Sequence, residues 1–382
     1  MRQYTIEDVL RIAKRYRNTK RSYLLVNPLQ AKHLPADPQQ ALALMETLGE
    51  SLRLAYPSAR LVIGFAETAT AIGAVVASKI AENCFYIQTT RETCPGSHYW
   101  LEFQEEHSHA VEQKLCDDAL ALGLADTDTV ILVDDEISTG KTILNMVRQM
   151  ADRYPVLRRK KIVAASILNR VTLEQESQLR KEGVVCHCLV KLPQEDYDAQ
   201  VERYAVQEAS EPSTWVPPVS LREWMLPVSQ HLNPRLGVKI SEYIAECQSV
   251  ANQFLAWANL PQNGRTLVLG TEECMLPAIL LGEQLAQLQE KGIVRCHATT
   301  RSPIGISQEE GYPIFTGSQV HSFYSDTRKT YLYNLDFYDT VIVVSDTQRE
   351  DTRALLSVIS AIPRRKTTRY FYIQGGNHVW YL

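Results

Sequence analysis

The sequence predicts an α/β protein made of two related domains with parallel sheets. The apolar run at residues 130–133 is typical of a strand buried on both faces, as in parallel α/β sheets. Strand and loop motifs of the first half recur in the second half in the same order. A chain of 382 residues is also long for one hydrophobic core, which favours two domains.

The hydrophobic pattern predicts the elements in order along the chain. Helices are expected at residues 5–17, 38–54, 69–80 and 142–154, where apolar side chains recur on one helical face. Strands are expected at residues 23–26, 60–63, 130–133, 162–168 and 184–192, with another beginning at residue 85. The closing residues 371–382 resemble an apolar edge strand with a Gly-Gly bend.

A Pro- and Ser-rich segment at residues 206–233 breaks this periodicity and is the expected linker. The predicted boundaries are therefore a first domain at residues 1–205 and a second domain at residues 234–382.

The strand at residues 130–133 runs directly into polar residues. Asp134 and Asp135 stand at its carboxyl end, where open α/β sheets place their ligands. The turn that follows consists of Ser138, Thr139, Gly140, Lys141 and Thr142. It opens a helix whose free backbone N–H groups and dipole suit a phosphate. Since carboxylates accept hydrogen bonds from vicinal hydroxyls, the whole order suits a sugar phosphate.

A Walker A loop is the competing interpretation of this turn. It requires a glycine five residues before Gly140, and that position is Asp135. The acidic pair would also repel the phosphates of a nucleotide. A P-loop-type ATPase is therefore the less favoured alternative.

A second strand, at residues 60–63, also ends in a loop of small and polar residues. This loop consists of Gly64, Phe65, Ala66, Glu67 and Thr68. The helix that follows completes another anion-binding design. Glu67 would repel a phosphate unless Mg²⁺ lies between them or the side chain faces another part of the ligand. An ordinary strand-to-helix turn is the alternative.

Residues 85–110 contain a strand and then a long polar segment, typical of a lid or binding loop. Arg91 follows the strand directly, and a guanidinium can bind an anion through two hydrogen bonds. Glu106, His107 and His109 are candidates for proton exchange, since histidine titrates near neutral pH. A metal held by these histidines is only weakly indicated, and no directly ligated metal is expected. A structural hairpin with solvated charges is the alternative.

Lys32 and His33 lie in a Pro-rich connection after the first strand. A Lys-His pair in a loop is commonly solvated surface, and the other interpretation is a contact with a ligand.

Composition excludes several classes of protein. A formal net charge of -4 and 45% hydrophobic residues describe an ordinary globular protein, not a nucleic-acid binder. The eight cysteines show no CxxC pairs, the N-terminus lacks the apolar core of a signal peptide, and residues 61–78 are interrupted by polar groups. We therefore expect a cytoplasmic protein without a membrane partner.

The second half repeats the first half in degraded form. The segment from Thr266 parallels the segment from Arg60, and the tripeptide Thr-Thr-Arg at residues 89–91 recurs at residues 299–301. Ser345 stands where Asp134 does, and QREDTRA replaces the small phosphate turn. We expect a related fold that lacks a phosphate site of its own.

The run VILVDDEISTGKT closely resembles the signature of the type I phosphoribosyltransferases, which bind 5-phosphoribosyl-1-pyrophosphate (PRPP). That family usually has a small residue where this chain has Lys141. VNPLQAKHLP, LEFQEEHSHA and the TRSP tetrapeptide at residues 300–303 resemble the phosphoribosyltransferase family with a C-terminal TRSP domain, known from gene neighbourhoods linked to tellurite resistance and stress. The resemblance implies a type I phosphoribosyltransferase fold, a parallel sheet with a small hood, followed by a degenerate phosphoribosyltransferase-like domain.

The resemblance also implies a reaction and roles for residues. PRPP, carrying Mg²⁺, would react with a nucleobase-like acceptor, or a nucleotide would undergo the reverse phosphorolysis. Asp134 and Asp135 would hold the ribose hydroxyls near an oxocarbenium ion, residues 138–142 the 5′-phosphate, and residues 64–68 the pyrophosphate. Arg91 and the histidine-rich lid would close over the pyrophosphate, with Lys32 and His33 as hood or base candidates.

A non-catalytic regulator that binds PRPP or a nucleotide is the main alternative function. For either function, we expect the C-terminal domain to supply an interface to a second copy or a partner protein, or to cover the first site.

Overall fold

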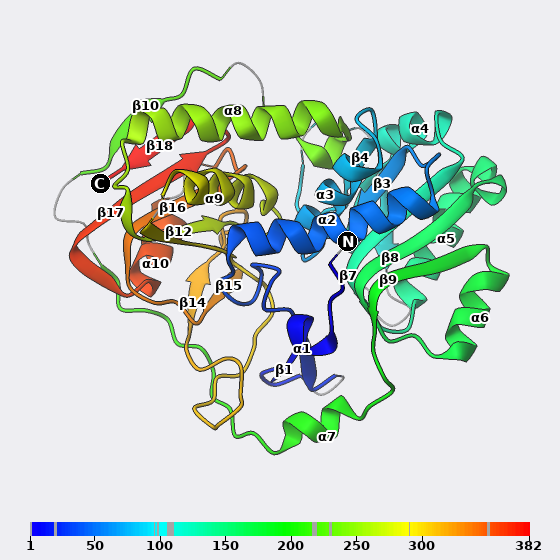
Figure 1. Cartoon of the computed structure of the whole chain (residues 1–382), viewed down its shortest axis with the longest axis horizontal. Helices are drawn as coiled ribbons and strands as arrows, with labels where there is room; N and C mark the ends of the chain where they lie inside the picture. The colour runs from blue at the N-terminus through cyan, green and yellow to red at the C-terminus, as the bar shows by residue number, and fades with distance from the viewer. Residues whose placement is uncertain are drawn as a thin grey trace. The chain divides into compact units, whose positions relative to one another are not determined.

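The chain folds into two compact units (Figure 1), and the computed structural model describes residues 2–18, 21–94, 96–97, 99–104, 111–215, 220–228, 231–289, 291–349 and 352–382. The first unit comprises Met1–Thr5, Ala43–Gln194 and Leu232–Glu246, and the second comprises Ile6–Leu42, Glu195–His231 and Cys247–Leu382. The domain boundaries predicted at residues 205 and 234 stay a prediction. The compact units are discontinuous in sequence: residues 6–42 belong to the second unit, and residues 232–246 belong to the first.

The first unit is organised around a six-stranded sheet of order β11-β4-β3-β7-β8-β9. All neighbouring pairs are parallel except β11 with β4, which is antiparallel. The strands are β3 (Leu61–Gly64), β4 (Phe85–Gln88), β7 (Thr129–Ile137), β8 (Lys161–Asn169), β9 (Val184–Lys191) and β11 (Val238–Lys239). The predicted parallel α/β fold is therefore confirmed for this unit.

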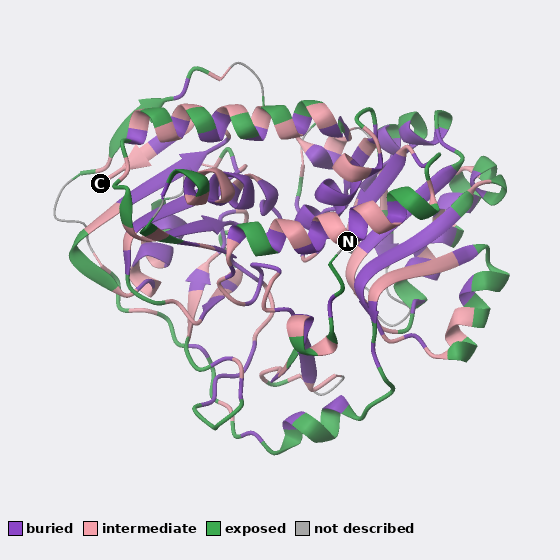
Figure 2. Ribbon diagram, viewed as in Figure 1, coloured by how far each residue is buried: buried purple, intermediate pink, exposed green. Residues whose placement is uncertain are grey.

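Helices and one hairpin connect these strands. The helices are α3 (Thr70–Ile80), α4 (Asp117–Ala125), α5 (Lys141–Arg153), α6 (Leu173–Lys181) and the 3₁₀ helices η1 (Pro155–Arg159) and η2 (Pro234–Leu236). The hairpin pairs β5 (Trp100–Gln104) with β6 (Val111–Cys116). Figure 2 shows the sheet strands mostly buried and α6 mostly exposed, and α6 accordingly buries only Leu179. Apolar side chains of α4 and α5 pack with those of β3 and β7 in one core.

Glycines let α3 pack closely on the sheet. A Cβ on Gly73 would lie 2.7 Å from the Cα of Gly64, so any side chain there would push the helix away from β3. The hydroxyl of Tyr86 donates to the carbonyl of Thr70 at 2.7 Å and holds the helix start against β4. The loop between β3 and α3 is therefore fixed at both ends.

The second unit has its own six-stranded sheet, of order β10-β18-β17-β16-β12-β13. The strands are β10 (Arg222–Met225), β12 (Asn263–Gly270), β13 (Lys291–Ala298), β16 (Tyr338–Ser345), β17 (Arg364–Gln374) and β18 (His378–Tyr381). β13, β12, β16 and β17 run parallel to one another, whereas β18 pairs antiparallel with both β17 and β10. The helices are α9 (Leu276–Leu288), α10 (Thr352–Ala361) and α7 (Tyr197–Glu202).

The two helices α2 (Pro38–Ala55) and α8 (Ile240–Ala258) contribute residues to both units. The confirmed α2 agrees with the helix predicted at residues 38–54.

The prediction of a helix at residues 5–17 was wrong. Only α1 (Ile6–Val9) is helical, and the next residues form β1 (Arg11–Lys14), which pairs antiparallel with β2 (Tyr23–Val26). Strand pairing outweighed the amphipathic pattern because these strands pack in an apolar cluster of the second unit. That cluster consists of Ala13, Leu24, Val26, Tyr204, Ala209, Ile304, Ile306, Tyr312, Ile314 and Tyr333.

The closing residues 371–382 were predicted to form an apolar edge strand with a Gly-Gly bend; the bend is confirmed, but the edge position was wrong. β17 and β18 form a hairpin across Gly375 and Gly376, both of which have positive φ, and β10 occupies the edge beyond them. The described part of the predicted linker therefore contains a strand of the second sheet.

The second unit repeats the topology of the first. β4-β3-β7-β8 matches β13-β12-β16-β17 in order and direction. The β5-β6 hairpin has its counterpart in the hairpin of β14 (Gly317–His321) and β15 (Lys329–Tyr333). Thr90 exchanges two backbone hydrogen bonds with Lys114, and Thr300 does the same with Tyr331. These shared details support the duplication that the sequence predicts.

Among the described residues, no helix is long and apolar enough to cross a membrane.

A buried carboxylate holds the far end of α5 in place. Asp117, which is 4% exposed, accepts hydrogen bonds from Arg153 at 2.8 Å and from the Tyr154 hydroxyl at 2.7 Å. The hydrogen bond from Arg153 is the main cause that lowers the pKa of Asp117, against the opposing effect of burial. A lowered folded-state pKa means that this stabilisation is present above the unfolded value of about 3.9 and is lost as pH falls through the folded value.

We therefore expect Asp117→Asn to lower the free energy of unfolding at pH 7 by about 1–3 kcal/mol, and by less at pH 3. Half of the Arg153 side chain is exposed, which favours the lower end of that range. Urea unfolding at both pH values measures this, with exposed Asp152→Asn as control. An equal loss at both pH values would contradict the assignment.

Candidate functional site

Asp134 and Asp135 lie inside β7 near its carboxyl end. The strand continues to Ile137, beyond the predicted residues 130–133, because Glu136 and Ile137 still pair with β8. Both aspartates are half-buried, and the amide of Asp135 donates to Asp134 Oδ1 at 2.9 Å. The two carboxylates therefore stand at the edge where parallel α/β sheets bind ligands.

The electrostatics of this pair favour a ligand that brings hydroxyl groups or positive charge. Loss of hydration on burial, followed by the charge of Asp135, raises the pKa of Asp134 well above its ordinary value. A second negative group beside Asp134 is therefore unfavourable unless a cation or hydrogen-bond donors accompany it.

The small turn and α5 provide an open helix N-terminus. Gly140 caps the helix with φ of 77°, in the left-handed region that favours glycine. Thr139, Lys141 and Thr142 are exposed, and Ser138 is half-buried. The opposite face of α5 is held in the core by Ile143, Leu144, Met146, Val147, Met150 and Ala151. This arrangement leaves the helix N-terminus and the Lys141 side chain accessible, which suits an anion.

The loop at residues 64–68 lies at the end of the neighbouring strand β3 and is largely buried. The peptide bond between Ala66 and Glu67 is cis. The Thr68 hydroxyl donates to Asp135 Oδ1 at 2.7 Å, which joins this loop to the aspartate pair. The structure thus brings together two stretches that lie more than sixty residues apart in the chain.

Thr89 supports this loop from β4, and the sequence interpretation had given it no role. Its hydroxyl accepts a hydrogen bond from the amide of Ala66 at 2.8 Å, and its own amide donates to the carbonyl of Gly64 at 2.9 Å. In the second unit, Thr299 accepts from Glu272 and donates to Gly270 in the same way. The recurrence of Thr-Thr-Arg was the sequence signal that could have identified Thr89.

Arg91 is exposed just beyond β4 in the first unit. Glu106, His107 and His109 lie outside the described residues, between the strands β5 and β6. The role predicted for these three side chains stays a prediction.

Lys32 and His33 are buried in the second unit, so their interpretation as solvated surface was wrong. Lys32 Nζ donates to the carbonyls of Glu272 at 2.8 Å and Thr299 at 2.9 Å. Burial, followed by the charges of His33 and Lys32, lowers the pKa of the neighbouring His297 to about 3. All of these contacts lie within the second unit.

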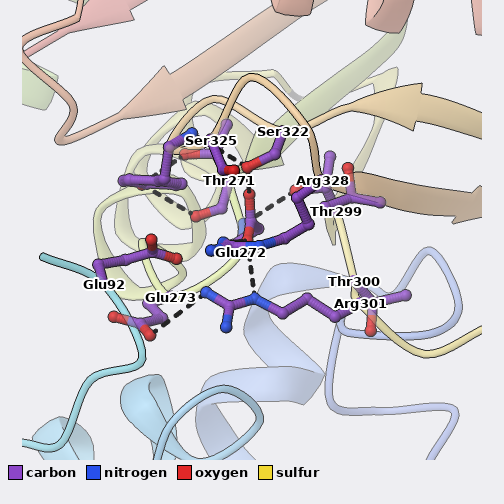
Figure 3. A network of polar contacts seen from close by, with 12 residues as sticks. Glu92, Thr271, Glu272, Glu273, Thr299, Thr300, Arg301, Ser322, Ser325 and Arg328 are labelled. Atoms are coloured by element: carbon purple, nitrogen blue, oxygen red, sulfur yellow. Dashed lines mark hydrogen bonds and ion pairs between the residues drawn. The ribbon is translucent and has the colours of Figure 1, made fainter. Parts of the chain in front are cut away.

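The corresponding edge of the second unit is filled by ion pairs. Figure 3 shows Arg301 and Arg328 directed at Glu272, whose Oε2 accepts from them at 2.8 and 2.7 Å. Asp346, which stands where Asp135 does, accepts from the hydroxyl of Tyr324 at 2.5 Å. The carboxylates of Glu272 and Asp346, which could accept hydrogen bonds from a sugar, therefore already accept them from side chains of the same unit.

Glu272 is fully buried, so its removal should be costly. We expect Glu272→Gln to lower the free energy of unfolding by about 3–5 kcal/mol, because two arginines would lose the carboxylate that they share. Asp336→Asn removes an exposed ion pair with Arg265 and should cost at most about 1 kcal/mol. Urea unfolding of the full chain compares the two. If Glu272→Gln lowered the free energy of unfolding as little as Asp336→Asn does, the buried ion pairs would contribute little to stability.

Among the described residues, no group of three or more His, Cys, Asp or Glu side chains could hold a metal ion. The carboxylates that the two loops offer are Glu67, Asp134 and Asp135.

Comparison with protein families gives two matches, separated by residues 193–232. Residues 9–192 match a family described as phosphoribosyl transferase. Residues 233–362 match a family described as the TRSP domain that lies C-terminal to it. Among proteins with curated descriptions, no match was found.

Solved structures that resemble the chain include three adenine phosphoribosyltransferases. The enzyme of Giardia lamblia, complexed with 9-deazaadenine, is 13% identical, with 48% of this chain and 94% of that chain covered and a TM-score of 0.33. The enzyme of Rhodothermus marinus is 14% identical, with 49% of this chain and 96% of that chain covered and a TM-score of 0.36. The enzyme of Trypanosoma brucei, in complex with AMP, pyrophosphate and ribose-5-phosphate, is 18% identical, with 41% of this chain and 68% of that chain covered and a TM-score of 0.30.

Proposed function

The chain belongs to the phosphoribosyl transferase family that carries a C-terminal TRSP domain, and we propose that its first unit binds PRPP with Mg²⁺ and transfers the phosphoribosyl group. The acceptor is a nucleobase-like molecule, or the enzyme runs the reverse phosphorolysis of a nucleotide. The observation that carries this proposal is the hydrogen bond between Thr68 and Asp135, since it joins the two loops into one site.

The aspartate pair and the turn divide the ribose phosphate between them. Asp134 and Asp135 accept hydrogen bonds from the two ribose hydroxyls, which requires neighbouring acceptors at the sheet edge. The exposed N-terminus of α5 receives the 5′-phosphate, and Lys141 adds a positive charge beside it.

The loop at residues 64–68 receives the pyrophosphate together with Mg²⁺. Glu67 is 6% exposed, and a carboxylate in that place is unfavourable for an anion alone. Mg²⁺ is commonly held by one or two carboxylates and by substrate phosphates, so the carboxylates of the two loops fit an ion that arrives with PRPP. When bound, Mg²⁺ neutralises the leaving pyrophosphate.

The reaction needs positioning and charge stabilisation. The bond from ribose C1′ to the pyrophosphate oxygen breaks, the pyrophosphate leaves with the electron pair, and a nitrogen of the acceptor forms the new bond to C1′ and releases its proton. The carboxylates of Asp134 and Asp135 lie where positive charge develops on the ribose, and Arg91 follows the strand beside the pyrophosphate loop.

A regulator that binds PRPP or a nucleotide without turnover is the second candidate. It would keep both loops but would not need the polar residues of the hairpin region. Hydrolysis of ATP is disfavoured because Asp135 replaces the first glycine of a Walker A loop.

The eight cysteines show no CxxC pairs in the sequence, which supports the proposed action in the cytoplasm. The chain resembles a family known from gene neighbourhoods linked to tellurite resistance and stress, which supports a role in such resistance or in a stress response.

Asp135→Asn should weaken the binding of Mg-PRPP by about 1–3 kcal/mol, the scale of a lost charge-assisted hydrogen bond. Asp128→Asn is the matched control, because this exposed aspartate precedes the opposite end of the same strand. Isothermal titration calorimetry measures both. No binding by the wild type would remove the proposal, and equal affinity of the Asp135 variant would remove the role of this residue.

Arg91→Ala and His107→Ala should each lower turnover by roughly 10²-fold or more and leave the thermal midpoint nearly unchanged. Steady-state and single-turnover rates with PRPP and a panel of bases measure the effect. Glu102→Gln, an exposed position on β5, is the control. Wild-type rates in both variants would leave the hairpin region without a catalytic role. Wild-type binding without any turnover would favour the regulator.

A further inference from the structure

We propose that Arg235, which follows the predicted linker in the sequence, is a positioning residue for the pyrophosphate loop of the first unit. The inference rests on the proposed function, because it deepens the account of the same site. It implies that the phosphoribosyl site is complete only with the start of the TRSP segment.

The segment at residues 232–246 is built into the first unit. Asn233 Oδ1 accepts from the amide of Arg235 and caps η2 at its N-terminus. Gly237 ends this turn with φ of 77°, and a Cβ there would lie 2.6 Å from the ring of Phe85. β11 then pairs antiparallel with β4, and the amide of Ile240 donates to the carbonyl of Cys84 at 3.0 Å. The segment is therefore held at a fixed place on the sheet.

Arg235 reaches from this segment to the end of β4. Its side chain is buried, with the residue 4% exposed, and Nε donates to the Thr90 hydroxyl at 3.2 Å. A second contact joins its Nη1 to Asn233 Oδ1 at 3.5 Å. A guanidinium is costly to bury unless its hydrogen bonds are made, so this arrangement fixes the residues that accept them.

Thr90 transmits this position to the loop. Its hydroxyl also accepts from the amide of Glu92 at 2.9 Å, and its backbone pairs in both directions with Lys114. The preceding residue, Thr89, is the one that holds Ala66 and Gly64 of the pyrophosphate loop. The residue that follows is Arg91. Arg235 therefore fixes Thr90, whose two sequence neighbours are Thr89, which supports the pyrophosphate loop, and Arg91.

This arrangement gives a physical reason for the order of the two family matches. The TRSP match begins at residue 233, so its first residues include the η2 turn and β11 of the first unit. A phosphoribosyltransferase domain that ended at residue 205 would lack β11, the edge strand beside β4, and the guanidinium of Arg235 that donates to Thr90.

The test compares Arg235→Met with Thr90→Val, which removes the acceptor and keeps the shape of the side chain. In the folded full chain, each variant should weaken Mg-PRPP binding by roughly tenfold. The double variant should lose less affinity than the product of the two single losses, because both variants remove the hydrogen bond that Arg235 donates to Thr90. Arg235→Lys should recover part of the affinity. Lys239→Met is the control, because this exposed side chain on β11 pairs only with Glu242 in the described contacts. Titration calorimetry supplies the affinities.

Hydrogen exchange in the absence of ligand separates this inference from the proposed function. The amides of Ala66 and Thr89 should exchange faster in Arg235→Met and Thr90→Val than in the wild type or in Lys239→Met. Unchanged exchange with unchanged affinity would overturn the role of Arg235 while the proposed function stands. Absence of PRPP binding by the wild type would overturn the proposed function, and the exchange rates alone would then decide whether Arg235 positions the loop. If Arg235→Met does not fold, Thr90→Val decides.

Discussion

The first unit depends on one constraint: its parallel strands end at the same edge of the sheet, so loops that are distant in sequence meet there. The hydrogen bond from Thr68 to Asp135 is the direct expression of this constraint, because it joins the end of β3 to the end of β7. Gly64 and Gly73 allow α3 to start close enough to the sheet for this contact. The amphipathic face of α5 fixes the second loop from the other side. Packing thus places the acid pair beside the turn proposed for the 5′-phosphate and the loop proposed for the pyrophosphate.

The second unit shows what the same topology becomes when its polar edge is used for stability. Thr299 supports Glu272 there as Thr89 supports Ala66, yet the buried Glu272 is shared by Arg301 and Arg328. An edge that satisfies its own charges has little left for a ligand. In the first unit, by contrast, the like charges of Asp134 and Asp135 lie beside each other, and burial together with this repulsion raises the pKa of Asp134. Hydroxyl donors of a ribose and a metal ion would relieve this repulsion. This difference between the two units supports the proposal that the phosphoribosyl site lies in the first unit.

The parts of this account that are local in sequence could be predicted. A strand, two acids, a small turn and a helix follow one another at residues 130–154, so their order alone indicated an anion site at a sheet edge. Contacts set by strand order could not be predicted, and they include Thr68 with Asp135 and Arg235 with Thr90. Residues 11–14 were misassigned to a helix because their partner strand, and not their own pattern, decides their structure. Lys32 gave no sign of burial, since its acceptors are carbonyls that lie far along the chain.

The central claim is that one of the two related units binds PRPP. A crystal structure of the full chain grown with PRPP and Mg²⁺ tests it most directly. The account predicts the ribose at Asp134 and Asp135, the 5′-phosphate at residues 138–142 and the pyrophosphate at residues 64–68, with Glu272 still paired to Arg301. PRPP bound at the edge of β12 and β16, or no PRPP bound to the first unit at saturating concentration, would contradict the account.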